Sequence, residues 1–168
     1  LTRYYQADAG AVISASHNTV EYNGIKFFDK NGCKLPDAVE DRIEEIIRNG
    51  DPNMKFPVGD RVGRPVRQRN AQRRYIDFVK ETTGVRLDGL HIVVDCAQGA
   101  SSMVAPTALS ELGAVVSAYY HEPDGTNINE NCGSTHIEQL ADFVKKLKYF
   151  AGVAFDGDAD RCLAVDEK

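Results

Sequence analysis

Short apolar runs alternate with amphipathic segments after Asn70, and this alternation constrains the fold more than any other feature of the sequence. The apolar runs have the length and the Ile, Val and Ala content of buried strands. The segments between them have apolar residues at helical spacing and glycines near their ends. Such alternation predicts an α/β fold with a mixed, largely parallel sheet and helices packed on it. The expected strands are 91–96, 115–119, 152–155 and 162–165, and the expected helices lie near 75–82, 104–112 and 135–147.

Two of these helices carry more specific predictions. The apolar face of the first should contain Tyr75, Phe78 and Val79, with Gly84 after its end. In the last, Thr135 and Glu138 have the spacing of a capping box, which predicts that the helix begins there.

The first fifty residues predict a smaller arrangement of the same kind. A strand is expected at 11–13, and the Asn-Gly pair at 31–32 predicts a hairpin between strands at 24–28 and 33–35. A helix should follow over 39–47 and end at Gly50. Residues 51–69 are rich in proline, glycine and arginine, as inter-domain connections are. We therefore expect two domains, 1–69 and 70–168.

Composition excludes several classes of protein. Hydrophobic residues make up 42% and charged residues 27% of the chain, which is ordinary for a folded domain, and the net charge of -5 argues against nucleic-acid binding. No apolar run approaches the length of a membrane span. The four cysteines are scattered without a C-x-x-C pair, which favours reduced thiols and a cytoplasmic protein. Because the chain starts at Leu1 rather than at a methionine, we expect it to be an excerpt.

The most specific motif is the acidic segment 156–161, Asp-Gly-Asp-Ala-Asp-Arg, between the last two expected strands. Three carboxylates at alternating positions repel one another unless they surround a cation. Oxygen ligands favour Mg²⁺ or Ca²⁺ over zinc. An EF-hand loop is excluded because its sixth position needs glycine, and here it is Arg161. A bound Mg²⁺ facing a phosphate fits the aspartates and Arg161, and a solvated acidic turn is the remaining alternative.

A second polar loop, 14–18, follows the first expected strand. Ser16 beside His17 suggests a serine hydrolase, but no G-x-S-x-G elbow surrounds the serine. A polar turn is the better interpretation of this loop taken alone. Lys26, a few residues downstream, is a further candidate for the same site.

Taken together, the two loops resemble those of the α-D-phosphohexomutase superfamily. The similarity rests on Ser-His-Asn at 16–18, Asn-Gly-Ile-Lys at 23–26 and the acidic segment 156–161. It extends over nearly the whole chain and implies the end of the family's first domain followed by its second. Two further domains, the third and fourth of such an enzyme, would then be absent from this sequence.

The resemblance implies a role for each motif residue. Ser16 matches the serine that the family phosphorylates, and the three aspartates match the ligands of one Mg²⁺ per active site, with Ser16 as a further ligand. His17, Lys26 and Arg161 match the surroundings of the reacting centre. The implied activity is phosphoryl transfer between the two ends of a sugar phosphate, through a phosphoserine and a bisphosphate intermediate. The implied metal ligands are Ser16, Asp156, Asp158 and Asp160.

The segment 123–136 is similar to the phosphoglucosamine mutase branch, which implies glucosamine 6-phosphate and glucosamine 1-phosphate as substrates. Phosphomannomutase or phosphoglucomutase activity is the nearest alternative, and a non-catalytic metal-binding module is a more distant one. The expected partner is a sugar phosphate rather than a nucleic acid or a membrane, and the whole enzyme could be a homodimer. The isolated excerpt should be inactive.

Three residues depart from the family's usual pattern. Thr19 replaces a proline, Gln98 an asparagine and Ala159 the glycine of the acidic loop. If residue 159 needs a positive φ, alanine costs about 1 kcal/mol or more there.

Overall fold

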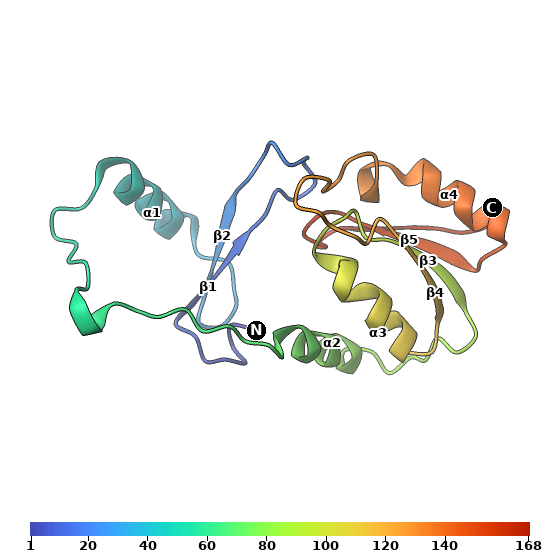
Figure 1. The fold of residues 1–168 in the computed structure, drawn as a ribbon, viewed down its shortest axis with the longest axis horizontal. Coiled ribbons are helices and arrows are strands. Elements are labelled where there is room, and N and C mark those ends of the chain that lie inside the picture. Colours follow the sequence, from blue (N-terminus) through green and yellow to red (C-terminus); the bar gives the residue numbers. More distant parts are fainter. The chain divides into compact units, whose positions relative to one another are not determined.

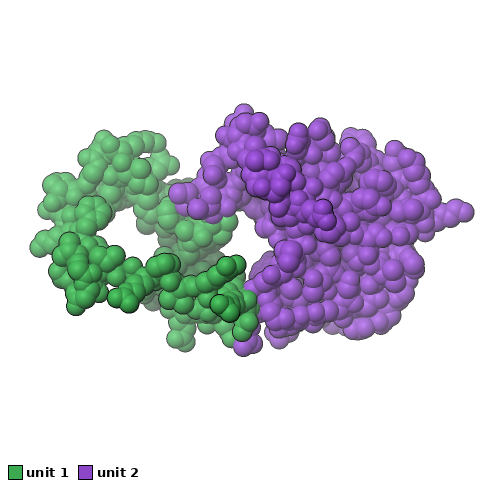
Figure 2. Space-filling view, in the orientation of Figure 1, with its two compact units in different colours: residues 1–12, 26–71 green, residues 13–25, 72–168 purple.

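Two units make up the chain in the computed structural model, which describes residues 1–168. Unit 1 consists of residues 1–12 and 26–71, and unit 2 consists of residues 13–25 and 72–168 (Figure 2). The loop that carries Ser16 therefore belongs to the same unit as the acidic loop, although Ser16 and Asp156 are 140 positions apart in the sequence.

The core of unit 2 is a four-stranded sheet in the order β4-β3-β5-β6 (Figure 1). Its strands are β3 (His91–Asp95), β4 (Val115–Tyr119), β5 (Ala151–Phe155) and β6 (Cys162–Val165). The first three are parallel, and β6 is antiparallel to β5. Asp95 pairs with Tyr119 on one side and Ala154 on the other, so the three parallel strands end at the same edge. The predicted α/β fold with a mixed, largely parallel sheet is confirmed.

Helices α3 (Ala105–Glu111) and α4 (Ile137–Leu147) lie on opposite faces of this sheet (Figure 1). The alternation of side chains along β3 explains this arrangement. Ile92 and Val94 pack into a cluster that includes Leu109 of α3, while Val93 packs against Leu140 and Val144 of α4. Each fully buried aliphatic side chain contributes roughly 1.5–3 kcal/mol, so β3 holds both layers together.

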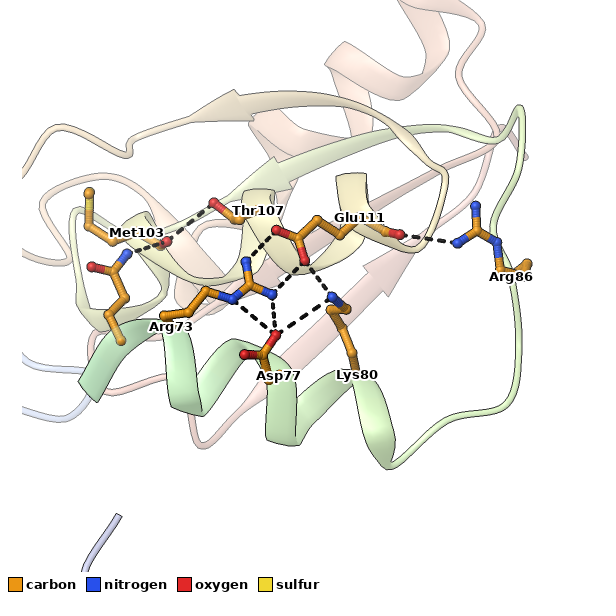
Figure 3. A network of polar contacts seen from close by, with 8 residues as sticks. Arg73, Asp77, Lys80, Arg86, Met103, Thr107 and Glu111 are labelled. Atoms are coloured by element: carbon orange, nitrogen blue, oxygen red, sulfur yellow. Dashed lines mark hydrogen bonds and ion pairs between the residues drawn. The ribbon is translucent and has the colours of Figure 1, made fainter. Parts of the chain in front are cut away.

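Helix α2 (Ala71–Glu81) differs from its prediction in the face that it buries. Ile76 is buried, whereas Tyr75 and Phe78 are 44% and 62% exposed. Polar contacts link the helix to α3: Arg73 donates to Glu111 at 2.5 and 2.8 Å and also contacts Asp77, and Lys80 contacts Glu111 (Figure 3). Helical spacing identified the helix, but it could not show that ion pairs would attach α2 to α3.

Unit 1 is built around strands β1 (Ala9–Ile13) and β2 (Ile25–Asp29). The last residue of β1 and the first residue of β2 already belong to unit 2. The predicted Asn-Gly turn is confirmed, since Gly32 has a φ of +78° and the Asp29 carboxylate accepts hydrogen bonds from the N–H groups of Asn31 and Cys33. The predicted strand 33–35 is reduced to a single bridge between Phe28 and Lys34. Helix α1 (Asp37–Asn49) and a short 3₁₀ helix (Gly59–Arg61) complete the unit.

The predicted capping box of α4 is wrong. Thr135 belongs to a 3₁₀ turn (Gly133–Thr135), and His136 precedes the helix without any side-chain cap. The turn is instead held by the buried Asp95 carboxylate, which accepts a hydrogen bond from the Gly133 N–H at 2.8 Å. A tertiary contact has replaced the local signal.

No helix is both long and apolar enough to form a membrane span.

Candidate active site

The acidic loop connects the antiparallel strands β5 and β6 at the edge where the parallel strands end. One carboxylate oxygen from each of Asp156, Asp158 and Asp160 lies within 4.8 Å of the other two. Their exposure increases along the loop, from the buried Asp156 to the exposed Asp160. The structure thus brings the three predicted aspartates together, with Asp160 exposed to solvent.

Asp156 is the most buried of the three aspartates, and its environment disfavours a negative charge. Burial raises the pKa of its carboxyl, and the neighbouring carboxylates of Asp158 and Asp160 raise it further, although the Arg161 N–H donates to Oδ1 at 3.2 Å. Its Oδ2 is buried and accepts no hydrogen bond. The Arg161 Nε lies 3.8 Å from this atom, on a side chain that is half exposed. A cation among the three carboxylates would compensate the buried charge.

Residue 159 does adopt the left-handed conformation, with a φ of +62°. An alanine is strained there because its Cβ crowds the following carbonyl oxygen. The loop keeps this conformation in spite of the missing glycine, and the Ala159 N–H donates to the Asp156 carbonyl at 3.0 Å.

Ser16 also has a left-handed backbone, with a φ of +55°. Its neighbour Ser14 connects this loop to the acidic loop: the Ser14 Oγ accepts a hydrogen bond from the Ser16 N–H at 2.8 Å and donates one to Asp158 Oδ2 at 3.0 Å. One hydroxyl therefore fixes the distance between the serine loop and the carboxylate cluster.

The two loops are also in close backbone contact. A Cβ on Gly157 would lie 2.6 Å from the Ser16 carbonyl oxygen and 2.7 Å from the Asn129 side-chain nitrogen, so only glycine fits between them. Asn129 donates from the same nitrogen to the carbonyl oxygens of Ser16 and Asn18. Sequence reasoning missed Ser14 and Asn129 as site residues, because both roles depend on contacts more than a hundred residues apart in sequence.

His17 and Lys26 are the other residues predicted for the site. The His17 Nδ1 lies 3.5 Å from the Ser16 Oγ, at the outer limit of a hydrogen bond. Lys26 lies on β2 and belongs to unit 1.

Comparison with protein families identifies the chain. The family model for phosphoglucomutase/phosphomannomutase, alpha/beta/alpha domain I, matches residues 1–54, and the model for domain II of the same family matches residues 73–168. The chain belongs to this family. Both loops of the site fall within the matched ranges, the serine loop in domain I and the acidic loop in domain II.

Curated relatives in the phosphoglucomutase/phosphomannomutase family are highly similar to the chain. The phosphoglucosamine mutase of Ruminiclostridium cellulolyticum is 59% identical over 99% of this chain. That of Clostridium perfringens (strain 13 / Type A) is 56% identical over the whole chain. The chain spans 37% and 38% of the length of these two relatives.

Solved structures support the fold of this family member. A phosphoglucomutase/phosphomannomutase family protein from Burkholderia thailandensis matches 95% of this chain and 34% of its own, with a TM-score of 0.73 and 21% identity. A structure from Thermus thermophilus matches 99% of this chain and 38% of its own, with a TM-score of 0.74 and 21% identity. At this level of identity the likeness concerns the fold alone.

Proposed function

We propose that this chain is part of a phosphoglucosamine mutase, which interconverts glucosamine 6-phosphate and glucosamine 1-phosphate. The choice of sugar is supported by identities of 54–59% to curated phosphoglucosamine mutases. As a proposed division, residues 1–69 contain the end of the first domain and a linker, and residues 70–168 form the second domain. Two further domains would complete the enzyme, consistent with the 37% of the relative's length that the chain spans. We place the enzyme in the cytoplasm, where its four free cysteines would stay reduced.

The observation that carries this proposal is the hydrogen bond between Ser14 and Asp158, 3.0 Å long, which joins the serine loop to the carboxylate cluster. A nucleophilic hydroxyl beside a cation site is what phosphoryl transfer requires, because this reaction depends mainly on positioning and charge neutralisation. A solvated acidic turn would have no reason to be attached to a serine loop so distant in sequence.

The proposed chemistry uses Ser16 as the carrier of the phosphoryl group. The bond between phosphorus and the Ser16 Oγ breaks as a sugar hydroxyl forms a new bond to phosphorus, and the hydroxyl proton passes to a neighbouring base. His17, 3.5 Å from the Ser16 Oγ, is one candidate for that base. Lys26 is the other, through the family resemblance alone. The half-exposed Arg161 guanidinium could rotate to bind the transferring phosphoryl oxygens in a bidentate manner.

Mg²⁺ fits the residues present. Asp156, Asp158 and Asp160 offer oxygen ligands only, within 4.8 Å of one another, and one buried carboxylate oxygen of Asp156 accepts no hydrogen bond. When bound, the ion would supply positive charge next to the transferring phosphoryl group. With Ser16 as a further ligand when phosphorylated, the same site would hold the phosphoserine that we propose.

Phosphopeptide mapping tests the proposal. The chain, extended to the length of its relatives, would be incubated with Mg²⁺ and labelled glucosamine 1,6-bisphosphate, with the glucose and mannose bisphosphates and Ser16→Ala for comparison. We expect label on Ser16, transferred fastest from the glucosamine compound. Faster transfer from another sugar would replace the substrate but keep the mutase. No label on Ser16 from any of the three would refute the proposed chemistry.

A further inference from the structure

Asn129 is a buried polar residue with no role in the chemistry described above. Its side chain is enclosed, with the residue 4% exposed, and its backbone is left-handed, with a φ of +57°. The Nδ2 donates to the Ser16 carbonyl at 2.9 Å and to the Asn18 carbonyl at 2.7 Å. Carbonyl oxygens can only accept, so the amide nitrogen must face them, and both of its hydrogens are used on one loop.

This double contact explains how Ser16 can keep its left-handed backbone. A non-glycine residue in that conformation persists only where its surroundings hold it. The Ser16 N–H is held by Ser14 and the Ser16 carbonyl by Asn129, so both polar backbone groups of the residue are fixed. The second bond, to Asn18, fixes the loop on the other side of His17.

Asn129 is itself held in place by the end of β3. Its N–H donates to the Ala97 carbonyl at 2.9 Å. The Ala97 N–H donates in turn to the buried carboxylate of Asp95 at 2.8 Å, and the other oxygen of that carboxylate binds Gly133. A continuous chain of hydrogen bonds thus runs from the sheet, through Asn129, to the backbone of the proposed nucleophile.

We propose that Asn129 is a positioning residue, which holds the Ser16 loop in the conformation needed for phosphoryl transfer. The inference rests on the proposed function, since it assigns Asn129 to the reaction of Ser16. It acts through the loop backbone and does not require Asn129 to contact the substrate or a metal.

The test compares Asn129→Asp with Asn131→Asp in the chain extended to the length of its relatives. Aspartate has nearly the same shape as asparagine and tolerates a left-handed backbone, but it cannot donate to the two carbonyls. Asn131 is the matched control, because it is also left-handed, with a φ of +52°, and it is exposed. Asn129→Gly is a second variant, which keeps the backbone conformation and removes the amide without adding a charge.

Single-turnover transfer from the sugar bisphosphate to Ser16 is the first measurement. We expect both Asn129 variants to lower the rate at saturation on the order of 100-fold, with a much smaller change in the half-saturating concentration. The carbonyl ¹³C resonances of Ser16 and Asn18, measured without substrate, should shift in these variants. Asn131→Asp should change neither measurement.

The outcomes separate this inference from the proposed function. Unchanged transfer in a folded Asn129 variant would refute the positioning role alone, and so would unchanged carbonyl resonances. No labelling in the unsubstituted protein would refute the proposed function instead. If neither variant folds, hydrogen exchange in the unsubstituted protein decides: the side-chain amide of Asn129 should exchange far more slowly than that of Asn131, and equal rates would overturn the proposal.

Discussion

Replacing Asp158 by asparagine should make the chain more stable than the unsubstituted protein in the absence of Mg²⁺. When Mg²⁺ is present, the variant should be the less stable of the two. Asp158 lies between the buried Asp156 and the exposed Asp160 in the carboxylate cluster. Asparagine keeps the shape of the side chain and an oxygen that can accept from Ser14, but it removes one negative charge. The substitution therefore separates the cost of repulsion among the carboxylates from the gain on binding a cation.

The size of the effect follows from the separation of the carboxylates. At 4.8 Å, the upper limit for this cluster, one pair of unit charges repels by about 0.9 kcal/mol in water and about 3.5 kcal/mol at an effective dielectric constant of 20. Asp158 has two such neighbours and is partly exposed, so the low end applies and about 2 kcal/mol of repulsion is relieved. Weakening the charge-assisted hydrogen bond from Ser14 costs about 1 kcal/mol, which leaves a net stabilisation of about 1 kcal/mol.

Thermal unfolding with a chelator and then with increasing Mg²⁺ measures both effects. The variant should melt a few degrees higher than the unsubstituted chain in chelator. At about 100 times its dissociation constant, Mg²⁺ should stabilise the unsubstituted chain by about 2.7 kcal/mol and the variant much less, which reverses the order. Asp142→Asn, on the exposed face of α4, is the control for losing one charge. Equal stabilisation of both proteins by Mg²⁺ would refute a cation site at this cluster.

Two further predictions concern stability. Ala159→Gly should raise the free energy of unfolding by about 0.5–1 kcal/mol, because it relieves the strain at a φ of +62°. The same change at Ala141, inside α4, should lower the free energy of unfolding by a similar amount. Denaturant unfolding measures both, and a loss of stability at residue 159 would contradict the strain argument. The hydrogen bond from Arg73, with that from Lys80, lowers the pKa of Glu111 from 4.5 to about 2, so its stabilising effect should be complete above pH 4.5 and disappear as the pH falls toward 2. Unfolding of Glu111→Gln beside the unsubstituted chain should therefore give a stability difference that closes across this range, and a difference independent of pH would contradict the assignment.

The fold of unit 2 could be read from the sequence because its signals are local and mutually consistent. Strands β3 to β6 lie within one residue of their predicted bounds, since each is a short apolar run flanked by turn residues. The errors occur where a tertiary contact replaces a local preference. Thr135 has capping-box spacing, yet Asp95 holds the backbone just before it in a 3₁₀ turn. Tyr75 and Phe78 have core spacing, yet ion pairs attach the polar side of α2 to α3.

The site was only partly accessible to the same reasoning. The three aspartates carry their signal in a single short segment, and the structure brings their carboxylates together. Ser14 and Asn129 carry no such signal, because a serine in a polar loop and an asparagine in a turn are both common in surface connections. Asn129 lies in the loop after β4, and the pairing of β4 and β5 with β3 brings that loop to the same edge of the sheet as the acidic loop. Ser14 follows β1 and reaches this edge through its hydrogen bond to Asp158.

The same edge collects most of the strained backbone of unit 2. Left-handed non-glycine residues occur in the serine loop, in the loops that follow β3 and β4, and in the acidic loop; these are Ser16, Ala97, Gln98, Tyr120, Asn129, Asn131 and Ala159. Strain of this kind needs surrounding contacts to hold it, and here those contacts run from Asp95 through Ala97 and Asn129 to Ser16. If Asn129 positions the Ser16 loop as we propose, the buried Asp95 carboxylate belongs to the site as well, because it anchors the end of β3 to which Asn129 is bound.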